Sequence, residues 1–170
     1  QQPADQPNMS SSLECSEVQG RRDQREFIDL EKEIYRDDPN WVPPLWYDLR
    51  ERVGFKQHPF FDDADSMPFV VRREGRVVGR VVAIVNHAHN RRYDEKRGFF
   101  GFYQCHDDVE ASNLLLSTAC KWLHRQGMTD VRGPANPSLN YEVGLLVEGF
   151  DTPPTFLITY NRDYYGRLIE

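Results

Sequence analysis

The sequence has few of the features that mark secreted, metal-binding or membrane-spanning proteins. Its three cysteines, Cys15, Cys105 and Cys120, lie far apart and form no Cys-x-x-Cys pair, so neither a disulfide framework nor a zinc-thiolate site is indicated. The longest apolar runs, such as 81–85, are far shorter than the roughly 20 residues that cross a bilayer. Residues 1–12 lack the apolar core of a secretory signal. We therefore expect a cytoplasmic protein without a membrane partner.

Basic residues are also in the minority. The chain has 21 lysines and arginines against 27 acidic residues, a formal net charge of −6, and such a chain repels a phosphate backbone. We therefore expect no nucleic-acid partner. A hydrophobic fraction of 39% in 170 residues is enough for one core. The composition predicts a disordered polar leader at 1–12 and a single domain at 13–170.

Hydrophobic periodicity predicts strands and helices that alternate in the second half of the chain. Phe27, Leu30 and Ile34 share one helical face behind a cap at Asp23, and 77–86 is nearly continuous in β-branched residues. The predicted elements are a strand at 13–19, helices at 23–38 and 44–54, strands at 68–73, 77–86 and 98–104, a long helix at 107–127, a strand at 129–132, a short helix at 139–146 and a strand at 155–159. This order predicts an α/β (α+β) fold.

Four short motifs sharpen that prediction. They are Asp-Asp-Pro-Asn-Trp-Val-Pro-Pro at 37–44, Gly-Phe-Phe-Gly-Phe at 98–102, Arg-Gly-Pro at 132–134 and Gly-Phe-Asp-Thr-Pro-Pro at 149–154. Together they resemble a bacterial family of GNAT-like proteins named after YghO, over roughly residues 13–170. The resemblance implies the GNAT N-acetyltransferase fold, a central mixed, mostly antiparallel sheet flanked by helices. Members of that family are longer, and 164–170 resembles the helix before their last strand, so we expect a domain that lacks this strand.

The resemblance also implies a cofactor, acetyl-CoA, and an amine or other small-molecule substrate. In GNAT proteins the pantetheine arm bonds to the strand before the long helix, which here contains Phe100, Gly101, Phe102, Tyr103 and Gln104. The pyrophosphate lies on the N-terminus of the long helix, where backbone N–H groups attract anions. Acyl transfer from the thioester to an amine is the implied activity.

One departure from the GNAT pattern puts the cofactor in question. The phosphate loop usually reads R/Q-x-x-G-x-G/A, but 105–110 contains no glycine and three carboxylates, Asp107, Asp108 and Glu110. Like charge there would weaken phosphate binding. On one interpretation Asp107 and Glu110 only cap the helix. The alternative to an enzyme is therefore a catalytically degenerate GNAT-like binding module.

The segment 133–142 is the best candidate for a catalytic site because it gathers polar side chains just beyond a strand end. By analogy with the superfamily, Asn136 would orient an acyl carbonyl, Tyr141 would protonate the leaving thiolate, and Glu142 would deprotonate the acceptor amine. The structural alternative is that the prolines and asparagines shape a turn and cap a helix.

Three further features carry weaker indications. Tyr160, Tyr164 and Tyr165 offer phenols to a leaving group, or pack as aromatic residues commonly do. His87 and His89 have strand spacing, but the sequence suggests no third ligand, so we expect a solvated turn there and no metal. Exposed sheet edges would favour a homodimer.

Overall fold

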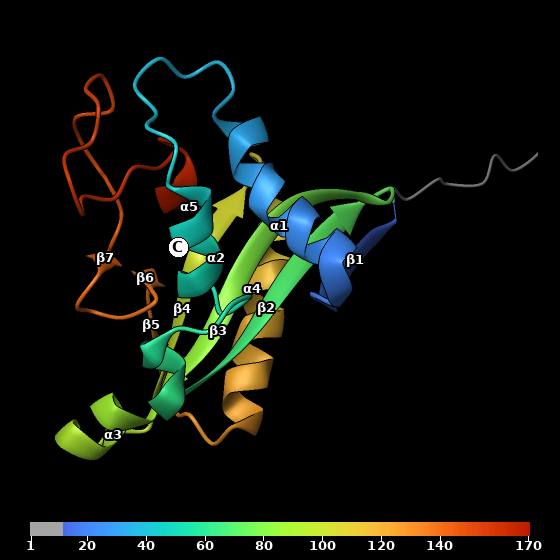
Figure 1. Cartoon of the computed structure of the whole chain (residues 1–170). Coiled ribbons are helices and arrows are strands. Elements are labelled where there is room, and N and C mark those ends of the chain that lie inside the picture. The colour runs from blue at the N-terminus through green and yellow to red at the C-terminus, as the bar shows by residue number, and fades with distance from the viewer. Residues whose placement is uncertain (1–11) are drawn as a thin grey trace, which may run out of the picture.

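The computed structural model describes residues 12–170. The first eleven residues of the predicted leader lie outside the described part of the chain. Five strands form one sheet in chain order, followed by a small two-stranded unit (Figure 1). The strands are β1 (Leu13–Glu17), β2 (Ala64–Arg73), β3 (Arg76–Asn86), β4 (Arg97–Cys105), β5 (Asp130–Arg132), β6 (Ala135–Asn136) and β7 (Glu142–Val143). The helices are α1 (Gly20–Ile34), α2 (Trp46–Arg52), the 3₁₀ turn η1 (Pro59–Asp63), α3 (His87–Tyr93), α4 (Val109–Arg125) and α5 (Tyr165–Ile169).

The sheet is mixed but mostly antiparallel, which confirms the predicted fold class. Strands β1 to β4 pair antiparallel, and β5 pairs parallel to β4 after the crossover through α4. A parallel neighbour requires such a crossover connection, and the long helix provides it. The β4–β5 pairing extends over 97–99 of β4, where β5 ends at Arg132.

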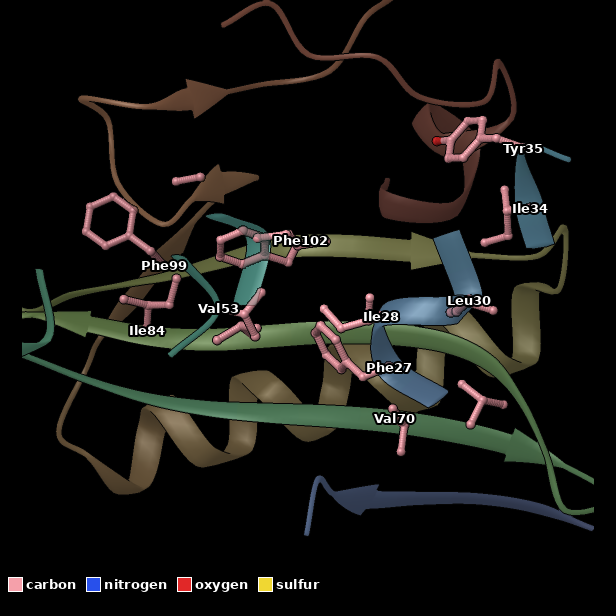
Figure 2. Close-up of a cluster of buried hydrophobic side chains, with 14 residues drawn as sticks. Phe27, Ile28, Leu30, Ile34, Tyr35, Val53, Val70, Ile84, Phe99 and Phe102 are labelled. Carbon is pink, nitrogen blue, oxygen red and sulfur yellow. The ribbon is translucent and has the colours of Figure 1, made fainter. Parts of the chain in front are cut away.

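Helices cover both faces of the sheet. Buried side chains of α1 and α2 pack on one face (Figure 2), and α4 and α5 pack on the other. The predicted stripe on α1 is confirmed, because Phe27 and Leu30 are at most 2% exposed. On the opposite face, Leu115 and Leu123 of α4 are fully buried against the sheet. Removal of apolar surface on both faces is the main source of stability in such a layered fold.

The helix starts differ from the predicted caps. Helix α1 begins at Gly20, before the predicted cap Asp23, and the Asp23 carboxylate accepts a hydrogen bond from the N-cap residue Gln19 at its N atom, at 2.9 Å. The cap of α4 is Asp108, which accepts from Ala111 N at 3.0 Å, and not the predicted Asp107. Asp107 instead pairs with Arg167.

Three predictions of secondary structure are wrong. The predicted turn at 87–97 contains the helix α3, which the Asn86 side chain caps by accepting from His89 N. The predicted helix at 139–146 contains only the short strand β7, and no strand forms at 155–159. The chain there follows an irregular path held by side chains, since the Asn161 Oδ1 atom accepts from Leu146 N at 2.7 Å. The apolar residues of these two segments therefore led us to predict more helix and strand than the structure contains.

Candidate functional site

The candidate site is built around a β-bulge in β4. Between the pairs Val82↔Gly101 and Arg80↔Gln104 the register shifts, and Phe102 adopts a left-handed φ of 53°. A bulge of this kind takes one residue out of the strand ladder. The freed Phe102 N–H donates to Asn136 Oδ1 at 2.6 Å, so the side-chain amide of β6 occupies this backbone donor.

Arg80 holds the carbonyl group of the same residue, Phe102. Its side chain is 1% exposed, and its Nε donates to the Phe102 carbonyl at 3.1 Å. Its other nitrogens donate to the Phe27 carbonyl at 2.7 Å and to the Glu31 carboxylate. The guanidinium thus fixes the bulge relative to α1 by three hydrogen bonds. An arginine inside the apolar run 77–86 was the sequence signal for this role, and our sequence interpretation missed it.

Beyond the end of β5, the strand β6 lies directly against β4. A Cβ atom on Gly101 would lie 1.8 Å from the Ala135 carbonyl oxygen, so the two backbones are in direct contact. Ala135 is fully buried. Only glycine permits so close an approach between two backbones. The predicted cofactor strand therefore has another part of its own chain against it at Gly101.

The end of β4 is covered by two tyrosines that frame the start of α5. The Tyr165 hydroxyl donates to Gln104 Oε1 at 2.6 Å and accepts from Cys105 N at 3.1 Å. The Tyr164 hydroxyl donates to the Cys105 carbonyl at 3.0 Å. Burial raises the pKa of Tyr164 to about 12, so this phenol stays protonated and remains a donor at neutral pH. These contacts agree with the packing interpretation of the two tyrosines.

The N-terminus of α4 carries a fixed carboxylate where a phosphate would have to lie. Asp108 caps the helix, and Arg73 donates to Asp108 at 2.7 Å and to Glu110 at 3.0 Å. The Arg73 guanidinium holds the pKa of the Asp108 carboxyl below its ordinary value, so the carboxylate stays charged. This helix end already holds an anion and has no glycine in its first turn. The residues here and on β4 do not fit the pyrophosphate and pantetheine of coenzyme A.

The structure brings the three predicted catalytic residues into one small unit. Asn136 and Glu142 are register partners in the β6–β7 pair, and Tyr141 precedes Glu142. Arg52 at the end of α2 anchors the unit, with its Nη1 3.5 Å from the Asn136 carbonyl oxygen and 3.7 Å from Glu142 Oε1. The Tyr141 ring packs against His58, with 6.1 Å between ring centroids. The chemical roles assigned to these residues stay predictions.

Removing the Asn136 side chain tests its contact with β4. We expect Asn136→Ala to lower the free energy of unfolding by about 1 to 3 kcal/mol, because the Phe102 N–H loses its acceptor in a buried site. Asn140→Ala is the matched control, since Asn140 is exposed and should change stability by less than about 0.5 kcal/mol. Chemical denaturation measures both, and equal effects would contradict the assigned contact.

The remaining polar candidates have structural partners. His87 Nε2 lies 2.8 Å from Asp65, and His89 Nε2 lies 3.1 Å from Glu95. Within residues 12–170 there is no cluster of three or more metal-ligating side chains. The Tyr160 hydroxyl donates to Asp38 Oδ2 at 2.9 Å.

Over the same residues, we find no helix with the length and apolarity needed to cross a membrane.

Two curated proteins are similar to this chain in sequence. Protein YghO of Escherichia coli K12 is 35% identical over 150 residues, which is 88% of this chain and 38% of that protein. A bacterial ceramide synthase of Caulobacter vibrioides is 38% identical over 147 residues, which is 86% of this chain and 38% of that enzyme. The chain thus spans less than two fifths of the length of both relatives. No protein family profile matches it.

Solved structures share the fold at low sequence identity. A tandem GNAT protein from the clavulanic acid biosynthesis pathway matches with a TM-score of 0.55 and 17% identity, over 73% of this chain and 39% of that one. AAC(6')-Iy, solved with a bisubstrate analogue of coenzyme A and acetylneamine, matches with a TM-score of 0.52 and 13% identity, over 76% of this chain and 84% of that one. At these identities the likeness concerns the fold alone.

Proposed function

The chain has the GNAT fold and is a relative of bacterial YghO, as its sequence predicts, and from this we propose that it is the acceptor-side unit of an amine N-acyltransferase. In this proposal the unit contributes to binding the amine, and the acyl-CoA is held by another part of a longer protein. The chemical class follows from the Caulobacter relative, because a ceramide is a long-chain amino alcohol acylated on nitrogen. A synthase of ceramide therefore forms an amide on an amine.

The observation that carries the coenzyme-free assignment is the contact between Asn136 Oδ1 and the Phe102 N–H. Acetyl-CoA, which the fold implies for 100–104, would need backbone groups of this strand. Phe102 N donates to Asn136, while Cys105 N and O bond to the tyrosine hydroxyls. The Phe102 N–H within 100–104 and both backbone groups of the adjoining Cys105 thus have internal partners, which supports the alternative of a unit without its own coenzyme site.

The proposal changes the expected role of one catalytic candidate and keeps two. In the proposal, the Asn136 side chain accepts the hydrogen bond of the Phe102 N–H and so makes this backbone donor unavailable to a coenzyme, instead of orienting an acyl carbonyl. Glu142 keeps its predicted role as the base for the acceptor amine, and Tyr141 keeps its role as a proton donor. Arg52 is a positioning residue, because it ties α2 to the β6–β7 pair.

We expect no coenzyme binding by the chain of 170 residues. A ligand that binds only the folded state raises the thermal midpoint, so about 1 mM acetyl-CoA or coenzyme A should leave the midpoint unchanged. Isothermal calorimetry with the same ligands provides an independent reading. A saturable rise in the midpoint, or turnover of an acyl-CoA by this chain alone, would overturn the coenzyme-free assignment.

A chimera tests the acyltransferase assignment separately. In it, this chain replaces the matching 147-residue region of the Caulobacter ceramide synthase. We expect the folded chimera to form ceramide, and its Glu142→Gln variant to lose most of the rate, since a positioned base contributes about 100-fold or more. Glu74→Gln in the β2–β3 turn is the control, because it makes the same change of charge at an exposed position away from β6 and β7. A folded chimera without ceramide formation would contradict the assignment.

A further inference from the structure

Two segments carry most of the exposed apolar surface. Of the twelve large hydrophobic side chains that are exposed in the described part of the chain, nine belong to segments 42–47 and 139–158. Leu45 is 79% exposed, Val147 is 77% exposed and Phe156 is 90% exposed. We call the exposed apolar side chains of these two segments the loop face. Single exposed apolar residues are ordinary, but a group of this size at one place indicates a contact surface.

Polar contacts hold the two segments of the loop face together. Asn40 Nδ2, just before the first segment, donates to the Phe150 carbonyl in the second at 3.4 Å. Arg52 Nη1, just after the first segment, lies 3.5 Å from the Asn136 carbonyl oxygen and 3.7 Å from Glu142 Oε1. Figure 1 shows the loops of both segments at the same end of the molecule, beside α5. The exposed apolar side chains of the two segments therefore belong to one region of the surface.

Packed aromatic rings support the loops. Tyr35, which is 1% exposed, stacks on Trp41 with 5.5 Å between centroids and 13° between planes. Its ring also contacts Tyr160 at 6.0 Å, and the Tyr160 hydroxyl donates to Asp38 Oδ2 at 2.9 Å. In Figure 2 the Tyr35 ring lies at the end of α1, close to α5. Loops held in this way need little ordering when a partner binds, which lowers the entropic cost of association.

Charges of both signs lie in and around the loop face. Arg162 Nη1 donates to Asp38 Oδ2 at 3.3 Å, and the Lys56 ammonium lies 4.1 Å from the centroid of the Tyr47 ring. Glu148 lies within the second segment. An anionic bilayer selects an excess of basic residues and a small ion selects one sign of charge, so neither matches this mixture. Apolar and aromatic side chains with a polar rim are the composition of a protein–protein interface.

The proposed reaction requires a protein partner at this place. Because another part of a longer protein holds the acyl-CoA in that proposal, this part must bring its thioester to the predicted base Glu142. Val143 follows Glu142 directly and Leu139 lies three residues before it, and both are exposed side chains of the loop face. The two curated relatives match this chain over only 38% of their own length, so the rest of each is longer than this chain. That length is enough for a further folded unit.

We propose that the loop face is the docking surface for the unit that holds the acyl-CoA in a longer protein of this family, and that docking brings the thioester to Glu142. This inference rests on the proposed function, because that function places the acyl-CoA outside this chain. It adds the place where the two units meet. The occupant is a folded unit of the same longer protein, and neither a second copy of this chain nor a bilayer.

Hydroxyl-radical footprinting tests the proposal because it reports the solvent exposure of individual side chains. It compares this chain alone with the folded chimera, in which the rest of the Caulobacter ceramide synthase is present. We expect the oxidation of Leu45 and Phe156 to fall about fivefold or more in the chimera, since an interface excludes water. Tyr93 and Val131 are the controls, because they are 57% and 38% exposed and lie outside both segments. A loop face that is as reactive in the chimera as in this chain would overturn the proposal.

Variants give a second test. The double variant Val147→Ser and Phe156→Ser should leave the thermal midpoint of this chain nearly unchanged, because both side chains are largely exposed. In the chimera the same double variant should lower the midpoint by about 4 °C or more, because apolar contacts between the two units are lost. Val131→Ser is the matched control and should leave both midpoints unchanged. A chimera whose midpoint does not respond to the double variant would overturn the proposal.

Sedimentation of this chain alone distinguishes the other occupants and does not depend on the chimera. We expect a monomer at about 10 μM that does not cosediment with phosphatidylglycerol vesicles. A dimer in which Phe156 is protected from oxidation would overturn the proposal in favour of a second copy. Vesicle binding that the double variant abolishes would overturn it in favour of a bilayer.

Ceramide formation separates this inference from the proposed function. A chimera that protects the loop face and forms no ceramide would support the docking surface and contradict the acyltransferase assignment. A chimera that forms ceramide while its loop face stays reactive would overturn the docking surface and leave the acyltransferase assignment intact.

Discussion

Replacing Arg80 with leucine is expected to lower the free energy of unfolding by about 3 to 5 kcal/mol. The guanidinium is 1% exposed and pairs with Glu31, which is itself mostly buried. Without Arg80, the carboxylate of Glu31 loses its cation, and the carbonyls of Phe27 and Phe102 lose their donor. Breaking one partner of a buried ion pair is costly because the other charge stays desolvated.

Arg76→Leu is the matched control for this prediction. Arg76 also pairs with a glutamate of α1, Glu33, but its side chain is 70% exposed. Exposed pairs of this kind contribute at most about 1 kcal/mol. Chemical denaturation of both variants, with circular dichroism at neutral pH, measures the difference. Similar losses in the two variants would show that Arg80 does not hold the bulge as its contacts indicate.

Adding one methyl group at Gly101 is expected to cost about 3 kcal/mol or more, at the upper end of overpacking penalties. The new Cβ of Gly101→Ala would lie 1.8 Å from the Ala135 carbonyl oxygen, and a backbone atom cannot move aside as a side chain can. Strand β6 must then separate from β4. The Phe102 amide would lose its bond to Asn136 at the same time, so its hydrogen exchange should become faster.

Gly166→Ala is the control for Gly101. A Cβ at Gly166 in α5 meets nothing within 4 Å, and alanine favours a helix, so stability should stay equal or rise slightly. Thermal denaturation and amide exchange compare the two variants. If Gly101→Ala unfolds like the wild type and keeps slow exchange at Phe102, then β6 does not lie directly against β4 at this position.

The position of Asn136 shows how far sequence alone leads to the site. Its residue type and its place after a strand end mark it as a candidate. Its actual partner, the Phe102 N–H, lies 34 residues away and becomes available only through the bulge in β4. No local sequence pattern predicts this contact, because the contact depends on how β6 lies against β4.

The sequence by itself determined the α/β fold class, the two long helices and the resemblance to GNAT-like proteins. Periodicity is local, so Phe27 and Leu30 specify the buried face of α1 without knowledge of the remaining chain. The acidic residues at 105–110 likewise put phosphate binding in question from the sequence alone.

Only the tertiary structure decided which segment lies against β4 beyond the end of β5 and where apolar side chains stay exposed. The strand predicted at 155–159 failed because Phe156 and Ile158 have no sheet to pack on, and their exposure is a property of the assembled molecule. The hydrogen bonds from the Phe102 N–H to Asn136 and from the Cys105 N–H to Tyr165 join residues that are far apart in the sequence. Contacts of that kind depend on the packing of whole elements, and a sequence pattern records only neighbours along the chain.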